Sequence, residues 1–213
     1  MGAHSFHLET PYGSLYFSGG NSKVKVPVFN VGAATDCPHK ATCSFSFHNK
    51  GDWKAGVCYA QRTETIYSTV LNARRKNEEV LRLLNQSDDM EYHASRLAEY
   101  MMKICRKRQV KYVRFNESSD LAGWNIRFLS TLSKALVYRG IRPYGYSKSS
   151  PELREIMTSA GCLIRESEVD FVAVDSAADI PDSDSVDVCP GVGCGVTCCK
   201  CQRSFKKIYI VKH

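Results

Sequence analysis

The sequence predicts an α/β fold built from parallel strand–helix–strand units. Two long segments, starting near Thr63 and Asp89, place apolar residues at helical spacing between charged ones. After them, short runs rich in β-branched and aromatic residues alternate with further helical segments as far as Val174. A strand, helix, strand, helix, strand order is typical of a sheet whose strands run parallel.

Each element can be placed by its own pattern. Residues 6–31 read as extended structure, including a small hairpin, that leads into the first cysteine. The first helix runs for some twenty residues from Thr63. The later helices are expected at Asp89–Arg108, Ala122–Tyr138 with Gly140 as its stop, and Pro151–Thr158. Strands are expected at Val110–Phe115, Ile141–Tyr146, Cys162–Arg165 and Phe171–Val174, and Lys207–Val211 is expected to add an edge strand.

The chain has the length of one domain. We expect residues 1–213 to form a single α/β domain with three parts: an extended arm and cysteine loop (1–62), the βαβ core (63–177), and a cysteine-rich tail with the edge strand (178–213).

Composition is ordinary for a globular protein, with 43% apolar and 24% charged residues. We see no secretory signal and no run of about 20 apolar residues, so we expect a cytoplasmic protein, in the host cytoplasm if it is viral, and no membrane partner. The net charge of +7 supports nucleic-acid binding only weakly, because the basic residues are mostly spread along helices. The sequence leaves the oligomeric state open.

Half of the ten cysteines lie between Cys189 and Cys201, among glycines and with almost no bulky apolar side chain. Their spacing is too short for unstrained disulfide loops, and a cytoplasmic chain keeps thiols reduced. Glycines allow the tight turns that thiolates need to converge on one centre. The segment therefore predicts a bound metal ion or iron–sulfur cluster.

Three more cysteines, Cys37, Cys43 and Cys58, lie near the front in polar, loop-like sequence. Cys105 and Cys162 fall inside apolar periodic segments and are predicted to be core thiols. His39 and His48 lie within the cysteine loops and are either ligands or exposed loop residues. Three cysteines separated by three and then two residues are absent, so we do not expect S-adenosylmethionine chemistry.

Polar residues follow several predicted strands, and in parallel sheets such residues gather at the carboxyl-terminal edge. Among them Asp120 is either a general acid or base or the N-cap of the next helix. Lys148 either binds an anionic substrate or is simply exposed. Tyr144 and Tyr146 share one face of a strand, directed either to the core or to a bound group. The full set is Asn116, Glu117, Ser118, Asp120, Tyr146, Ser147, Lys148, Asp175 and Ser176.

The order of the motifs resembles a family of phage and plasmid gene products, which is loosely related to partial-barrel iron–sulfur proteins. The resemblance covers most of residues 21–213. It rests on Asn21-Ser-Lys23, Cys37-Pro38, Cys43, Cys58-Tyr-Ala60, Arg74 and Asn77, Ser119-Asp120, Tyr146-Ser-Lys148, and the closing Cys189-Pro190 with the cluster from Cys194 to Cys201. Ser119 stands where the family usually has glycine, the adjacent pair Cys198-Cys199 leaves the ligand at that position open, and the loop between Cys43 and Cys58 looks long.

The resemblance implies an incomplete parallel barrel, or an open βαβ sheet, that carries cysteine-rich metal-binding loops at the carboxyl ends of its strands. It implies one or two 4Fe-4S clusters, acting as an open-site Lewis acid or a redox centre beside Asp120, Tyr146 and Lys148 and in contact with a small-molecule substrate. Cys37, Cys43 and Cys58 would hold one cluster, and the tail would supply its last ligand from Cys189 or a second site from Cys189, Cys194, Cys198 and Cys201.

Two other functions stay open at this point. Zinc suits the same cysteines, and would give a zinc-stabilised module that binds nucleic acid through the basic segments. Without bound metal, the tail cysteines would make the protein a thiol redox sensor. Whether the protein is an enzyme, and for which reaction, does not follow from the sequence.

Overall fold

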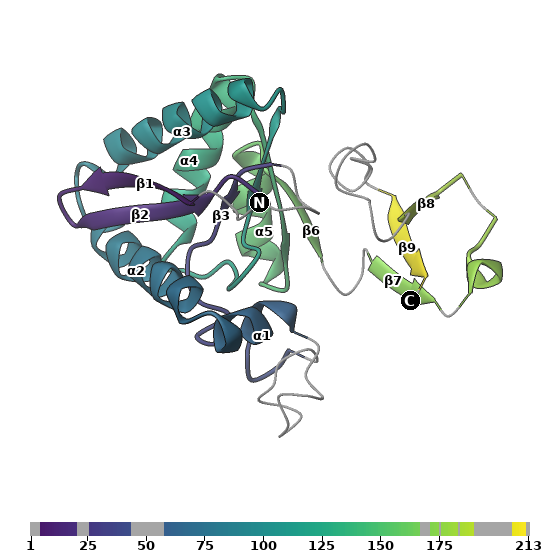
Figure 1. The fold of residues 1–213 in the computed structure, drawn as a ribbon. Coiled ribbons are helices and arrows are strands. Elements are labelled where there is room, and N and C mark those ends of the chain that lie inside the picture. The colour runs from purple at the N-terminus through teal and green to yellow at the C-terminus, as the bar shows by residue number, and fades with distance from the viewer. Residues whose placement is uncertain are drawn as a thin grey trace.

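The structure is a computed structural model that describes residues 5–20, 26–43, 58–166, 171–174, 176–182, 184–189 and 206–211. Its main sheet has six strands in the order β1-β2-β3-β4-β5-β6 (Figure 1). These are β1 (Ser5–Thr10), β2 (Gly13–Ser18), β3 (Val28–Phe29), β4 (Tyr112–Phe115), β5 (Arg142–Ser147) and β6 (Leu163–Glu166).

The sheet is mixed and open. β1 and β2 form the expected N-terminal hairpin, and β2 pairs with β3 in the antiparallel sense. From β3 to β6 all pairs are parallel. The α/β class is therefore confirmed as an open sheet with β1 and β6 at its edges, and the sheet does not close into a barrel.

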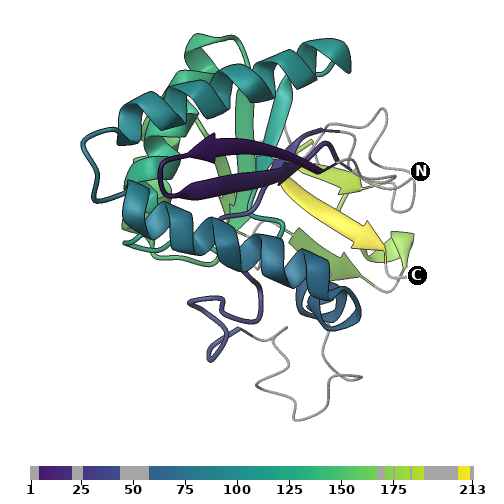
Figure 2. The same cartoon turned by 60° about the vertical axis from the view of Figure 1, so that its left-hand side comes forward.

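In the described part of the chain, five α-helices accompany this sheet: α1 (Tyr59–Ile66), α2 (Ser68–Leu84), α3 (Met90–Lys107), α4 (Ile126–Tyr138) and α5 (Pro151–Ser159). The single helix expected from Thr63 is divided in two, because Tyr67 has an extended backbone (φ −123°, ψ 94°) between α1 and α2. The hairpin β1–β2 lies between α2 and α3 in both views (Figures 1 and 2).

The main core lies between the sheet and α2, α3 and α4. Val113 and Phe115 of β4 enter it together with Leu97 of α3 and Phe128 and Leu132 of α4, all fully buried. Cys105 and Cys162 are buried in this core, as the sequence predicted.

A second, smaller apolar cluster contains the alternate residues of the same strands. Tyr112 and Tyr144 pack with Val26, and Tyr146 and Leu163 lie against them, partly buried. Because successive side chains of a strand point to opposite faces, β4 and β5 contribute to both clusters.

A separate three-stranded parallel sheet follows, with β7 (Phe171–Val174), β8 (Val186–Cys189) and β9 (Lys207–Val211) in the order β7-β9-β8. The expectation that Lys207–Val211 is an edge strand is wrong. β9 pairs with β7 on one side and β8 on the other, and its Ile208 is buried. Ser176, which follows β7, therefore belongs to this sheet and not to the edge formed by β4 and β5.

Within the described ranges, no helix is both long and apolar enough to cross a membrane.

Candidate functional site

The candidate site lies where three parallel strands end side by side. Phe29 of β3 is in register with Phe115 of β4, and Phe115 is in register with Gly145 of β5. The chain leaving these strands forms three neighbouring segments, residues 30–43, 116–125 and 148–150. Most of the predicted polar residues and the first two cysteines lie on these segments, which we call the rim.

The first two cysteines are held by tight turns. The Cys37 amide donates to the Ala34 carbonyl at 3.2 Å, and the Cys43 amide donates to the His39 carbonyl at 2.8 Å. Cys58 is the N-cap of α1, and its carbonyl accepts the amide of Arg62 at 3.1 Å. All three thiols are partly buried, and none forms a disulfide.

Cys43 and Cys58 lie close enough to Cys37 to influence it electrostatically. The pKa of Cys37 is raised to about 12, chiefly by burial and to a smaller extent by the negative charges of Asp120, Cys43 and Cys58, while a hydrogen bond from the His39 backbone amide lowers it. Among the residues that the structure describes, however, no three His, Cys, Asp or Glu side chains come together tightly enough to hold a metal ion.

The predicted ligands of the tail are not described. Cys194, Cys198 and Cys201 lie outside the described residues, as do Cys199, His48 and Asp175. Cys189 ends β8, but its side chain is likewise outside the description. Their part in metal binding stays a prediction.

Asp120 is the buried centre of the rim. One carboxylate oxygen accepts the Ser147 hydroxyl at 2.6 Å and the Leu121 amide at 2.7 Å, and the other accepts the Lys148 amide at 2.8 Å. Burial raises the pKa of this carboxyl group, against the lowering effect of these hydrogen bonds and of His39. The His39 Nε2 atom lies 4.0 Å from the carboxylate and is itself buried without a hydrogen bond.

Asp120 is not a helix cap, which was the alternative interpretation. α4 begins at Ile126, four residues later than expected, with Asn125 at its N-cap. Residues between them form a turn, in which Asn125 Oδ1 accepts the Ala122 amide at 3.0 Å and Asn125 Nδ2 donates to the Asp120 carbonyl at 2.9 Å. The carboxylate is therefore turned toward β5 instead of toward the helix.

The backbone before Asp120 is strained. Asn116 and Ser119 have φ values of 54° and 62°, in the left-handed region that favours glycine. Ser119, singled out in the sequence as a position expected to carry glycine, thus has a backbone conformation that favours glycine. The Ser119 hydroxyl is buried and has no hydrogen-bond partner among the residues that the structure describes.

Lys148 joins the carboxylate to the cysteines. Its amide binds Asp120, and its Nζ atom lies 3.1 Å from the Cys43 Sγ atom. Lys148 is thus partly buried and in contact with a thiol, and not simply exposed. The Ser147 hydroxyl also contacts Ser149, which the sequence interpretation did not single out.

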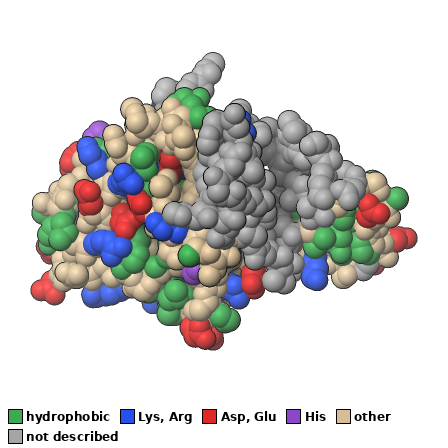
Figure 3. Space-filling model, turned by 90° about the horizontal axis from the view of Figure 1, so that it is seen from below, with side chains coloured by type: hydrophobic (Ala, Val, Ile, Leu, Met, Phe, Trp, Pro, Cys, Tyr) green, Lys and Arg blue, Asp and Glu red, His purple; other side chains and the backbone are tan. Residues whose placement is uncertain are grey.

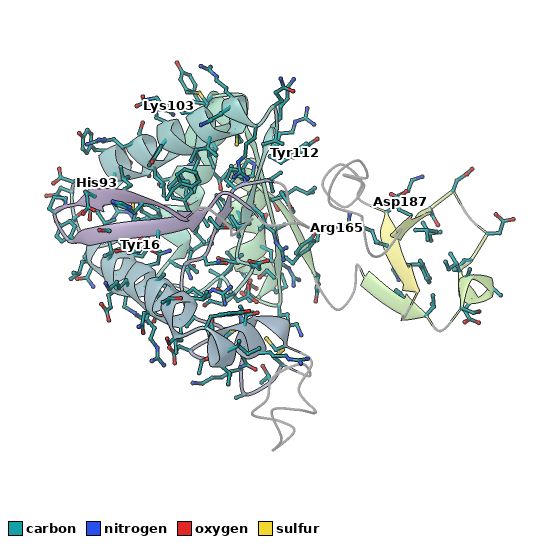
Figure 4. The ribbon with its side chains drawn as sticks, viewed as in Figure 1. Tyr16, His93, Lys103, Tyr112, Arg165 and Asp187 are labelled. Atoms are coloured by element: carbon teal, nitrogen blue, oxygen red, sulfur yellow. The ribbon has the colours of Figure 1, made fainter. Side chains whose placement is uncertain are left out.

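Tyr146 lies on the other face of β5 from Ser147. Its ring stacks near the Arg114 guanidinium, 5.2 Å from the ring centre, and meets Tyr144 at 6.1 Å. The neighbouring strand places Arg165 in register with it; that side chain is buried and donates to the Lys206 carbonyl (Figure 4). The structure thus brings Asp120 and Lys148 together at the rim, while a role for Tyr146 stays a prediction.

Two buried polar residues of α2, Arg74 and Asn77, bind segments next to the rim, and both were part of the resemblance noted in the sequence. Arg74 donates to Glu64 at 2.8 Å. Asn77 binds the amide and carbonyl of Tyr16 on β2, which lies beside α2 (Figure 4), and also the carbonyl of Asn30. Glu64 was missed by the sequence interpretation, because a single glutamate in a short amphipathic helix gives no signal of burial.

The described surface shows no single basic face in the view of Figure 3. Lys and Arg side chains there are interspersed with Asp and Glu. The view thus offers no specific support for nucleic-acid binding.

Comparison with known protein families places most of the chain in one of them. The sequence model of a family described as Gene product 88 matches residues 13–163. The matched range includes Cys37, Cys43, Cys58, Asp120 and Lys148, and it ends before the cysteines of the tail. No curated protein and no solved structure matches the chain.

Proposed function

This chain belongs to the Gene product 88 family, and on that premise we propose that it binds an iron–sulfur cluster at the rim through Cys37, Cys43 and Cys58. The observation that supports the proposal is the position of the first two cysteines. Cys37 and Cys43 lie on the segment that follows β3, where the Lys148 Nζ atom is 3.1 Å from the Cys43 Sγ atom, and Cys43 and Cys58 are both near enough to Cys37 to raise its pKa.

The donor set fits such a group in kind. Thiolates are the usual ligands of iron–sulfur clusters, and a set of three leaves one position for a further cysteine or a substrate. With a pKa of about 12, the Cys37 thiol holds its proton at neutral pH unless a metal ion binds it. Ligands must lose their protons to bind metal, so metal binding and proton release are coupled here. The remaining ligand is proposed to come from Cys189, Cys194, Cys198 or Cys201, which also suffice for a second site.

The other rim residues have chemistry suited to a small polar substrate. A bound cluster supplies either an electron or an open iron that acts as a Lewis acid. The Lys148 ammonium, 3.1 Å from Cys43, supplies a positive charge beside the thiols. Asp120 is the buried carboxyl group of the same rim, with its raised pKa, and we propose that it exchanges a proton with the substrate. The reaction itself is not assigned.

One observation also favours a second function, a thiol redox sensor. Reactive cysteines commonly lie beside basic side chains and are partly exposed. Cys43 is only partly buried, and its Sγ atom lies 3.1 Å from the Lys148 Nζ atom.

Anaerobic purification, followed by a visible spectrum and by analysis of iron, sulfide and zinc on one sample, tests the proposal. We expect a brown protein with a broad band near ~400 nm and equal amounts of iron and sulfide. A variant with Cys37, Cys43 and Cys58 all replaced by serine should lose one cluster. A matched variant with Cys105 and Cys162 replaced by alanine removes thiols from the core only and should keep its iron.

The other outcomes separate the alternatives. A colourless protein that holds zinc would overturn the cluster and direct attention to nucleic-acid binding measured at several salt concentrations. A protein without metal whose thiols oxidise reversibly would be a redox sensor.

A further inference from the structure

The feature that carries this inference is a buried carboxylate behind the cysteines, that of Glu64. Its Oε1 atom accepts the Ala34 amide at 2.7 Å and the Arg74 guanidinium at 2.8 Å. Its Oε2 atom accepts the amide of Thr35 at 2.9 Å and the hydroxyl of Thr35 at 2.7 Å. We call this set of four hydrogen bonds the Glu64 clasp.

The clasp connects two cysteine segments. Thr35 and Ala34 lie two and three residues before Cys37, and the Cys37 amide donates to the Ala34 carbonyl. Glu64 belongs to α1, the helix whose N-cap is Cys58. Helix α1 therefore connects Glu64 to Cys58, and a single turn connects Ala34 and Thr35 to Cys37.

A second contact strengthens the same connection. Gln61, also on α1, donates through Nε2 to the Ala34 carbonyl at 3.2 Å. Residue 34 is thus held from both its amide and its carbonyl by α1, while its carbonyl also accepts the Cys37 amide.

Arg74 extends the clasp to the third segment of the rim. Its guanidinium lies 2.8 Å from Glu64 and 3.9 Å from Glu117, which follows β4, and it donates to the Ala60 carbonyl. The side chains of Arg74 and Glu64 are 7% and 1% exposed. A buried ion pair contributes little to stability compared with apolar residues of the same volume, so its presence favours a role in fixing a particular geometry.

We propose that Glu64 and Arg74 are positioning residues that set the place of Cys37 relative to Cys58, so that both thiols face one bound group. The proposal rests on the proposed function, since it assigns the clasp to the site described above. It adds that the cysteine loop is held in shape by α1 and α2 and not by the bound group alone.

Amide hydrogen exchange on the full chain tests the clasp without any metal. Glu64→Gln keeps the size of the side chain but replaces one acceptor oxygen by a donor, so the Ala34 and Thr35 amides cannot both be satisfied. We expect these amides to exchange at least ~10-fold faster, as the loss of a hydrogen bond to a charged group implies, while amides of α3 and β4 keep their wild-type rates. Iron content of the anaerobically purified variant should fall by at least half.

Two further variants keep the test sharp. Thr35→Val removes only the hydroxyl contact and should give the same local effect in weaker form, even if Glu64→Gln folds poorly. Glu99→Gln removes a carboxylate from an exposed ion pair with Lys103 on α3 and should change neither measurement.

The outcomes distinguish the two proposals. Faster exchange across the whole chain, or unchanged exchange at residues 33–37, would overturn the clasp as a positioning device, as would wild-type iron content in Glu64→Gln. If the wild-type chain holds no iron–sulfur cluster, the proposed function is overturned, and a local change in exchange still supports the clasp as the link between the two cysteine segments.

Discussion

Replacing Asn77 by aspartate tests how far the buried polar side chains of α2 determine the stability of the sheet. Asn77 is 2% exposed. Its Oδ1 atom accepts the Tyr16 amide at 2.6 Å, and its Nδ2 atom donates to the carbonyls of Tyr16 and Asn30 at 2.7 Å each. An amide is the side chain that satisfies all three groups, because it offers one acceptor and two donor hydrogens.

The cost of Asn77→Asp can be worked out from these contacts. The carboxylate keeps the bond from the Tyr16 amide and loses both donated bonds, at about 1 kcal/mol each. It also places a buried negative charge against two carbonyl oxygens, so the free energy of unfolding should fall by about 3 kcal/mol or more at pH 7. Burial and the two carbonyls disfavour the charged form and raise the pKa of the introduced group in the folded state.

This rise gives the variant a characteristic pH dependence. A carboxyl group whose pKa is higher in the folded than in the unfolded state costs stability above the folded value and recovers it as the pH falls through the window between the two values. The difference in unfolding free energy between Asn77→Asp and wild type should therefore be smaller at pH 5 than at pH 7.

Urea unfolding at both pH values, followed by circular dichroism, measures these differences. Asn72→Asp is the matched control, because Asn72 is exposed on the same helix. The reasoning is refuted if Asn77→Asp is as stable as Asn72→Asp at pH 7, or if its cost does not decrease at pH 5.

Three further predictions use the same structure. Ser119→Gly should raise the free energy of unfolding by about 1 kcal/mol, because glycine adopts the positive φ without strain and the substitution removes a buried hydroxyl. The control Ser118→Gly loses the hydrogen bond from the Ser118 hydroxyl to the Gly32 carbonyl and should lower the free energy of unfolding. The opposite order of the two variants in thermal unfolding would contradict this reasoning. Arg74→Ala should lower the free energy of unfolding by about 3–5 kcal/mol, since it leaves the buried Glu64 carboxylate without its positively charged partner. Arg75→Ala breaks only a half-exposed ion pair with Asp36 and should lower it by about 0–1 kcal/mol. Equal losses of stability in urea unfolding would show that burial does not decide the effect. Burial raises the pKa of Cys105 to about 12 and also raises that of Cys162. Both thiols should therefore stay protonated and unreactive toward iodoacetamide at pH 8 in the folded chain, and should react after unfolding in urea, as measured by peptide mass mapping. Labelling of either thiol in the folded chain at the rate of the unfolded chain would refute this prediction.

Much of the main sheet and its helices could be predicted because their patterns are local. Apolar spacing placed α3, and Pro151 placed the start of α5, each within one residue of the observed ends. Gly140 at the end of α4 has the positive φ (74°) typical of a helix stop. These features depend on side chains that are neighbours in sequence.

The rim could be predicted only in outline. That polar residues after β4 and β5 lie together follows from the parallel arrangement, but the partners of Asp120 do not. A carboxylate just before a helix looks like a cap, but two of its three hydrogen-bond donors, Ser147 and Lys148, lie at the end of β5 and directly after it, far along the sequence. The burial of Arg74 and Asn77 could not be predicted for the same reason. Their partners lie on other segments, so in sequence they look like members of a solvated helix face.

The position of β9 carries a consequence for how the chain is made. β7 and β8 do not pair with each other, because each forms its ladder with β9. During translation the main sheet has all its strands once Glu166 has left the ribosome, whereas β7 and β8 have no partner in their own sheet until residues 207–211 emerge. The second sheet can therefore assemble only after the cysteine-rich segment between β8 and β9 has been synthesised, so the order of synthesis places this segment before the completion of the sheet.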